Sequence, residues 1–210
     1  MLDVAPEDID WSDTPHMTDS GIARHLWPRH RARAADVYDL TALEQRCLAK
    51  LNAELTQAPE RCVAIPGATS VFEHLRQKDW HVALATGGWL SSATMKLHAA
   101  GLVVTDLPMA CADDAESRED IVRLAWQRAE AQAGVTFRRV VSVGDAPWDV
   151  RTARSLGLPF VGIAAGVTAD RLWREGATTV LADLSDRVAV LGALTSAASP
   201  AATDSPSRTR

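Results

Sequence analysis

From residue 65 onward, short apolar runs alternate with amphipathic segments, and this alternation constrains the fold more than any other feature of the chain. The apolar runs predict strands over 81–86, 108–111, 139–143, 159–164 and 179–181. Helices are predicted over 68–79, 91–100, 117–133, 147–156, 169–175 and in the segment that leads to Leu194. Strands separated by helices run parallel with right-handed crossovers, so the sequence predicts an α/β fold with a doubly wound parallel sheet.

The N-terminal part of the chain has a different pattern of apolar residues. Residues 34–57 carry apolar side chains at gaps of three and four, which predicts an amphipathic helix with one buried face. Asp19 is expected to cap a shorter helix that Pro28 ends. We therefore expect three parts, which are a helical cap region over 1–64, an α/β core over 65–194 and a disordered tail over 195–210.

The composition excludes several classes of protein. The 210 residues have a formal net charge of −5, which leaves no basic footprint for nucleic acid. A cluster of Arg29, Arg31 and Arg33 favours a solvated face over a binding patch. No run is apolar enough to span a membrane, and no signal peptide is evident, so we expect a cytoplasmic protein. Free thiols are expected at Cys47, Cys62 and Cys111. The oligomeric state is not predicted.

The first candidate site follows the strand predicted over 81–86. The Thr86 hydroxyl and the amides of the glycines after it, beginning with Gly87, could hold a phosphoryl oxygen. Glycines at this position also suit a plain turn, so both interpretations stay open.

The second candidate site follows the strand predicted over 139–143. Asp145 leaves this strand and Asp149 lies one helical turn further on, so that the two carboxylates could form part of a Mg²⁺ site. The alternative is that Asp145 caps the helix beginning at Pro147 and Asp149 favours the positive end of its dipole. The spacing does not decide between them.

A phosphate site also needs a basic side chain, for which Lys96 and Arg118 are the candidates. Lys96 lies within a predicted helix, and Arg118 follows the strand predicted over 108–111. Arg118 is preferred because ligands bind at the carboxyl ends of strands in such sheets. Arg118 could instead pair with the acidic residues that precede it.

These residues resemble the motifs of a known family. Thr86 on its strand, a basic residue after the next strand, and Gly144-Asp145-x-x-x-Asp149 are similar to motifs II, III and IV of the haloacid dehalogenase superfamily. The sequence from Lys96 to Leu102 resembles that of the phosphoglycolate-phosphatase-like members, which have a helical cap and a Rossmann-type core. The resemblance covers about residues 60–194.

The resemblance implies a phosphatase-type hydrolase of a small phosphorylated metabolite that uses Mg²⁺. In the family an Asp attacks the phosphoryl group and becomes an aspartyl phosphate, and a second Asp two residues later acts as general acid and base. By resemblance, Thr86 and Gly87 bind phosphate and Arg118 or Lys96 steadies it. Asp145 is a metal ligand, and Asp149 is a ligand or supports one.

The strand that carries the nucleophilic Asp in the family is not evident in this sequence. No apolar strand ending in Asp-x-Asp precedes Thr86, although the resemblance places such a strand between those of Thr86 and Asp145. Asp8 and Asp10 have the right spacing but no apolar strand before them, and we interpret them as a chance match. We expect the native protein to begin upstream of Met1, and the chain as given to be inactive. The segment Thr18-Asp19-Ser20-Gly21 resembles a cap segment that faces the active site, or is a plain helix N-cap.

Two other functions remain open. A non-catalytic relative would bind Mg²⁺, phosphate or a protein partner without turnover. Dehalogenation in the same fold needs no Mg²⁺, and is less favoured because it would leave the Asp145 and Asp149 pair without a role.

Overall fold

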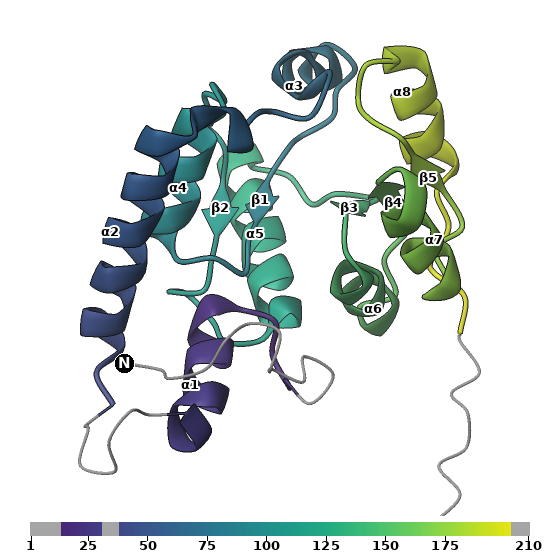
Figure 1. The fold of residues 1–210 in the computed structure, drawn as a ribbon. Helices are drawn as coiled ribbons and strands as arrows, with labels where there is room; N and C mark the ends of the chain where they lie inside the picture. Colours follow the sequence, from purple (N-terminus) through teal and green to yellow (C-terminus); the bar gives the residue numbers. More distant parts are fainter. Residues whose placement is uncertain (1–13, 31–37, 203–210) are drawn as a thin grey trace, which may run out of the picture. The chain divides into compact units, whose positions relative to one another are not determined.

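A computed structural model describes residues 14–30 and 38–202, which fall into two compact units (Figure 1). The first unit comprises the residues through Ala64 together with Val82–Ala133, and the second comprises Ile65–His81 and the residues from Gly134 onward. Residues 82–133 group with the N-terminal helices, to which helix packing and hydrogen bonds join them. The division into a cap region over 1–64 and a core over 65–194 stays a prediction.

In the first unit, two parallel strands pack on a helix. Its elements are α1 (Asp19–His30), α2 (Leu40–Gln57), η3 (Pro59–Arg61), β1 (Leu84–Ala85), α4 (Leu90–Ala99), β2 (Met109–Ala110) and α5 (Arg118–Ala133). Leu84 lies opposite Met109 in the parallel pair. Ala110, Ile121 and Ala125 form a buried cluster that holds α5 against the strands, and α2 packs on α4.

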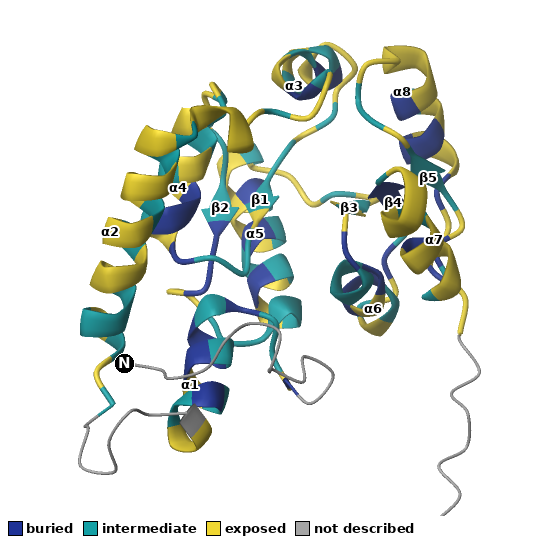
Figure 2. Ribbon diagram, in the orientation of Figure 1, coloured by how far each residue is buried: buried dark blue, intermediate teal, exposed yellow. Residues whose placement is uncertain are grey.

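The second unit contains a three-stranded parallel sheet in the order β3-β4-β5. Its elements are α3 (Ala68–Arg76), β3 (Ser142–Gly144), α6 (Pro147–Ser155), β4 (Phe160–Ile163), α7 (Gly166–Arg174), β5 (Val180–Leu181) and α8 (Arg187–Ser196). All four residues of β4 are buried, and α6, α7 and α8 pack against this strand (Figure 2).

The predicted α/β fold with parallel strands is confirmed, and each strand predicted between 81 and 181 is present in shortened form. The predicted helix ends are confirmed as well, since Gly101, Gly134 and Gly157 follow α4, α5 and α6 with positive φ. β1 and β3 each have one strand neighbour within the described residues. The strand expected between them is not among residues 14–30 and 38–202.

Two predictions for the N-terminal helices are wrong. Pro28 lies inside α1, which continues to His30, and the side chain that caps this helix belongs to Thr18 rather than Asp19. The helix predicted to start at residue 34 begins at Leu40, with Asp39 as its N-cap. None of its residues is fully buried, because α2 covers α4 from outside instead of entering a core.

Residues 195–202, which belong to the tail expected to be disordered over 195–210, have a defined place in the structure. Thr195 and Ser196 end α8, and the segment after them packs on the second unit. Phe160 N donates to Ala198 O over 3.0 Å, and Ala201 N donates to Gly176 O over 2.9 Å. The low-complexity composition did not predict that this segment is ordered. Backbone hydrogen bonds hold it in place, and these do not depend on side-chain type.

Among the residues that the structure describes, none of the helices combines the length and the hydropathy that crossing a bilayer requires.

Candidate active site

The turn after β1 places Thr86 and Gly87 at the carboxyl end of the strand. Thr86 N donates to Ala110 O over 3.0 Å, which extends the pairing of β1 with β2 by one residue. Gly88 N then donates to Thr86 Oγ1 over 3.1 Å. Since this oxygen accepts a hydrogen bond, its own O–H proton remains to be donated. Within the described residues, neither this O–H nor Gly87 N–H has an acceptor.

Arg118 lies against this turn. A Cβ at Gly87 would lie 2.5 Å from Arg118 Nη1 and 2.7 Å from Met17 O, so only glycine leaves room for the guanidinium there. Arg118 Nη1 also donates to Met17 O over 3.2 Å. The structure therefore brings together Thr86, Gly87 and Arg118, three of the residues expected to bind phosphate.

Lys96 is not brought to the turn. It lies in the last turn of α4, whereas the Thr86 turn precedes the first residue of that helix. Its side chain is exposed. About six residues of helix, on the order of 9 Å along the axis, separate the two ends. Of the two basic candidates, Arg118 is therefore the one beside Gly87.

Carboxylates cover the N-terminal amides of α4. Trp89 N donates to Asp19 Oδ2 over 3.0 Å, and Leu90 N donates to Asp113 Oδ2 over 2.7 Å. A free helix N-terminus would attract an anion, but here two internal carboxylates satisfy these amides. Gly88 N already donates to Thr86 Oγ1. Of the two glycine amides expected to bind an anion, Gly87 N–H is therefore the one that remains available.

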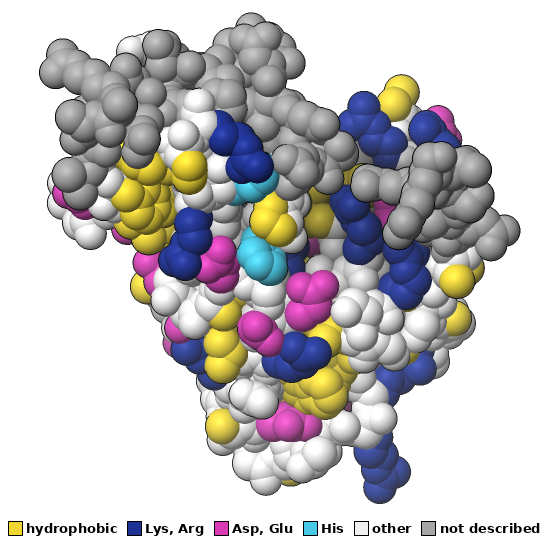
Figure 3. Space-filling view, turned by 90° about the horizontal axis from the view of Figure 1, so that it is seen from below, with side chains coloured by type: hydrophobic (Ala, Val, Ile, Leu, Met, Phe, Trp, Pro, Cys, Tyr) yellow, Lys and Arg dark blue, Asp and Glu magenta, His cyan; other side chains and the backbone are white. Residues whose placement is uncertain are grey.

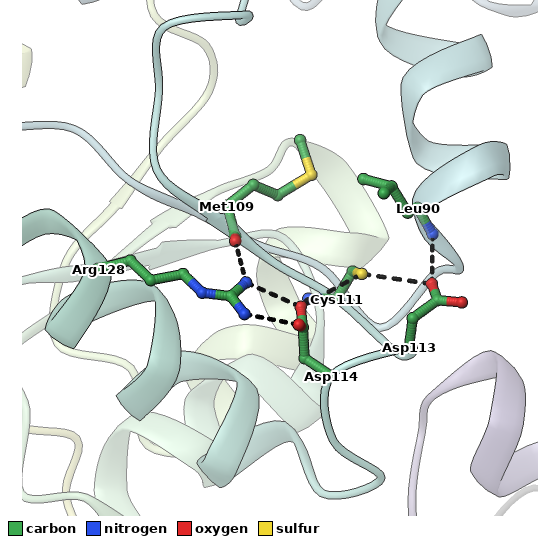
Figure 4. A network of polar contacts seen from close by, with 6 residues as sticks. All are labelled: Leu90, Met109, Cys111, Asp113, Asp114 and Arg128. Carbon is green, nitrogen blue, oxygen red and sulfur yellow. Dashed lines mark hydrogen bonds and ion pairs between the residues drawn. The ribbon is translucent and has the colours of Figure 1, made fainter.

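A network in the loop after β2 supports Asp113 and its neighbour Asp114 (Figure 4). Arg128 donates to both oxygens of Asp114, over 2.9 and 2.6 Å, and also to Met109 O. The Arg128 hydrogen bonds lower the pKa of Asp114 to about 2. Burial raises the pKa of the Cys111 thiol to about 11, and this thiol donates to Asp113 over 3.3 Å. Cys111 therefore stays protonated and serves as a structural donor rather than a nucleophile.

In the second unit, Asp145 follows β3 and its side chain is exposed. Asp149 Oδ2 accepts from Asp145 N over 3.2 Å and from Ala146 N over 3.1 Å. Asp149 is therefore the residue that caps α6, and the alternative in which Asp145 caps this helix is wrong. This contact holds the Asp145 backbone and leaves the Asp145 carboxylate as the exposed oxygen donor.

Within the described ranges, no group of three or more His, Cys, Asp or Glu side chains gathers in a way that could hold a metal ion. Asp145 and its neighbouring backbone can supply only part of a coordination shell for a hard cation, and water or a ligand oxygen would supply the rest. Asp8 and Asp10, the expected chance match, lie outside the described residues.

Sequence patterns predict no role for Asp113 or for the carbonyl of Met17. Thr18-Asp19-Ser20-Gly21 was the one signal for this part of the site, and it was equally compatible with a helix cap. The helix-cap interpretation is confirmed, since Thr18 Oγ1 accepts from Gly21 N at the start of α1. Asp19 contacts the turn after β1, and the interpretation that the segment faces the active site stays a prediction.

Comparison with known proteins then decides the family. Residues 9–157 match the model of haloacid dehalogenase-like hydrolases. The chain belongs to this family. Hydrolases of the family generally use Mg²⁺. No curated protein matches the chain.

Several solved structures are similar to the chain. A hydrolase from Pseudomonas syringae is 24% identical, with a TM-score of 0.56 over 76% of this chain and 74% of that one. A conserved haloacid dehalogenase-like protein of unknown function from Agrobacterium tumefaciens is 21% identical, with a TM-score of 0.48 over 84% of this chain and 78% of that one. The likeness to the first of them shows the shared fold.

Proposed function

We propose that this member of the family is a phosphatase-type hydrolase that acts on a small phosphorylated metabolite. The donor set after β1 carries the proposal. Thr86 O–H and Gly87 N–H have no acceptor in the described part of the chain, and the Arg118 guanidinium lies against them. Hydrogen-bond donors beside a guanidinium match the charge and the oxygen geometry of a phosphoryl group.

Asp145 is the proposed ligand for Mg²⁺. Its carboxylate is an exposed oxygen donor of the kind that this cation prefers, and Asp149 fixes the backbone that carries it. In hydrolases of this kind, Mg²⁺ supplies positive charge that stabilises a transferring phosphoryl group. The proposed role of the residues in this chain is to bind the phosphoryl group and the cation and to orient them. Within residues 14–30 and 38–202 no Asp-x-Asp follows a strand, so these residues do not supply the nucleophilic Asp that the family implies.

A binding protein without turnover is the second candidate. The observation that favours it is the pair of carboxylates, Asp19 and Asp113, which satisfies amides at the start of α4. A site built in this way accepts phosphate only through Thr86, Gly87 and Arg118. Charge gives no support to a nucleic-acid partner, because acidic and basic side chains of the described residues intermingle on the face drawn in Figure 3.

Calorimetric titration of inorganic phosphate into the full chain tests the binding step. Thr86→Val keeps the shape of the side chain and removes the donor, and it should weaken binding about tenfold. Arg118→Ala should weaken it at least as much, whereas Lys96→Ala should leave it unchanged. If phosphate does not bind, or if Lys96→Ala weakens it as much as Thr86→Val, the proposed site is wrong.

Hydrolysis of p-nitrophenyl phosphate, with Mg²⁺ and with a chelator, then separates the two candidates. Chelator-sensitive turnover supports the hydrolase, and phosphate binding without turnover supports the second candidate. Broadening of NMR signals by Mn²⁺ reports the cation site independently of activity. Asp145→Asn should remove this broadening near residue 145, whereas Asp170→Asn, which changes an exposed carboxylate on α7, should not.

A further inference from the structure

Asp19 contacts the phosphate-binding turn with both its backbone and its side chain. Asp19 N donates to Gly87 O over 2.7 Å, and Asp19 Oδ2 accepts from Trp89 N over 3.0 Å. The two contacts lie on either side of Gly88. This arrangement goes beyond a helix cap, since the capping oxygen of α1 belongs to Thr18.

The hydrogen bonds of the turn alternate in direction. Thr86 N bonds to Ala110 O and Gly88 O accepts from Ala112 N, both on the β2 side, whereas Gly87 O bonds to Asp19. Successive residues of an extended chain direct their hydrogen-bonding groups to opposite edges. Asp19 therefore lies at the edge of β1 opposite β2, where β1 has no strand neighbour among the described residues.

The contact at Gly87 O sets the direction of the Thr86 hydroxyl. The C=O of Gly87 and the N–H of Gly88 belong to one planar peptide group and point in opposite directions. With the C=O directed at Asp19, the N–H is directed at Thr86 Oγ1, 3.1 Å away. That oxygen then acts as an acceptor inside the turn, and its proton is left for a ligand.

Neighbouring side chains hold Asp19 in place. Thr18, only 1% exposed, donates from Oγ1 to Glu116 O over 2.8 Å. Ser20 Oγ donates to Ala112 O over 3.2 Å. Residues on both sides of Asp19 are thus anchored to the loop between β2 and α5, which leads to Arg118.

We propose that Asp19 is a positioning residue that orients the Thr86–Trp89 turn so that Thr86 O–H and Gly87 N–H serve a phosphoryl group. This inference rests on the proposed function. It assigns Asp19 no contact with substrate. A purely electrostatic role would be different, since the Asp19 carboxylate would then only repel an anion.

Three substitutions at Asp19 separate the two roles. Asp19→Asn keeps an oxygen that accepts from Trp89 N and removes the negative charge. Asp19→Ala removes both, and Asp19→Glu keeps the charge but displaces the carboxylate by one methylene. If Asp19 positions the turn, Asp19→Ala and Asp19→Glu weaken inorganic phosphate binding about tenfold, whereas Asp19→Asn binds at least as tightly as the unsubstituted chain. If Asp19 acts by charge alone, Asp19→Ala and Asp19→Asn both bind more tightly.

Amide hydrogen exchange at Trp89 is the second readout, and it needs no ligand. Exchange at this amide should accelerate about tenfold or more in Asp19→Ala and stay near its original rate in Asp19→Asn. Asp39→Ala is the matched control, because Asp39 caps α2 through Ala42 N and makes no hydrogen bond to the turn among the described residues. It should change neither phosphate binding nor exchange at Trp89.

Two results would overturn the inference. One is unchanged Trp89 exchange in Asp19→Ala, and the other is an Asp19→Asn chain that is as impaired as Asp19→Ala. Absence of phosphate binding in the unsubstituted chain, together with faster Trp89 exchange in Asp19→Ala, would refute the proposed function and leave the positioning of the turn established. If Asp19→Ala does not fold, Asp19→Glu against Asp19→Asn decides the question.

Discussion

β1 and β4 are both short parallel strands, but they are held in different ways. β4 has a strand neighbour on each side, and all four of its residues are buried. β1 has one neighbour within the described residues, and neither of its two residues is buried. Apolar packing therefore holds β4, whereas hydrogen bonds from Asp19 and from β2 hold the chain at the end of β1. The catalytic candidates follow the weakly buried strand, where polar contacts can direct donors toward a ligand.

The largest expected effect tests whether apolar packing holds β4 more firmly than β1. Phe160 in β4 is 0% exposed, so Phe160→Ala should lower the free energy of unfolding by about 3–5 kcal/mol. Leu84→Ala in half-buried β1 should cost less than about 2 kcal/mol. Denaturant titration followed by circular dichroism measures both, and equal costs would show that β1 is packed as tightly as β4.

The next largest effect tests the polar contacts at the end of β1. Gly87→Ala would place a Cβ 2.5 Å from Arg118 Nη1 and 2.7 Å from Met17 O. Relief of this overlap should cost about 1–3 kcal/mol in stability and displace Arg118, so phosphate binding should weaken by tenfold or more. Titration calorimetry checks the affinity. Gly192→Ala in α8 is the control, because a Cβ there meets nothing within 4 Å. Undiminished phosphate affinity in Gly87→Ala would exclude the close approach of Arg118.

A smaller effect is expected at the other strand end. Asp149 accepts from the amides of Asp145 and Ala146, so Asp149→Ala should lower stability by about 1 kcal/mol, as the loss of a helix cap does. Asp149→Asn keeps an acceptor oxygen and should retain most of this stability. Thermal unfolding of the two variants compares them, and equal losses would mean that charge rather than capping is what Asp149 contributes.

The smallest effect depends on pH. The pKa of Asp114 is lowered from 3.8 to about 2 because Arg128 donates to the ionised carboxylate. A lowered carboxyl pKa stabilises the folded chain above pH 3.8, and this stabilisation disappears as the pH falls toward 2. Because the pair is partly exposed, the loss in Asp114→Asn should be about 1 kcal/mol or less at pH 7. The difference between variant and unsubstituted chain should vanish near pH 2, and thermal unfolding across this range measures it.

Much of the fold followed from local sequence patterns. The strands at 84–85, 109–110, 142–144, 160–163 and 180–181 all lie within or next to the predicted runs. Glycine stops were predictable because a helix that ends in the left-handed region favours glycine. The packing of residues 197–201 was not predictable, since it depends on contacts between segments distant in sequence. The prediction that Pro28 ends α1 failed because the helix continues past this proline to His30.

The sequence alone determined the family resemblance, the alternation of helices with parallel strands and the two strand ends that carry polar side chains. Only the tertiary structure decided which side chains meet. It placed Arg118 rather than Lys96 beside Gly87, and it made Asp149 rather than Asp145 the cap of α6. It also set Asp19 against the Thr86 turn. Periodicity and spacing follow from local backbone geometry, whereas these choices depend on directions and distances of a few ångströms between segments that the chain brings together only on folding.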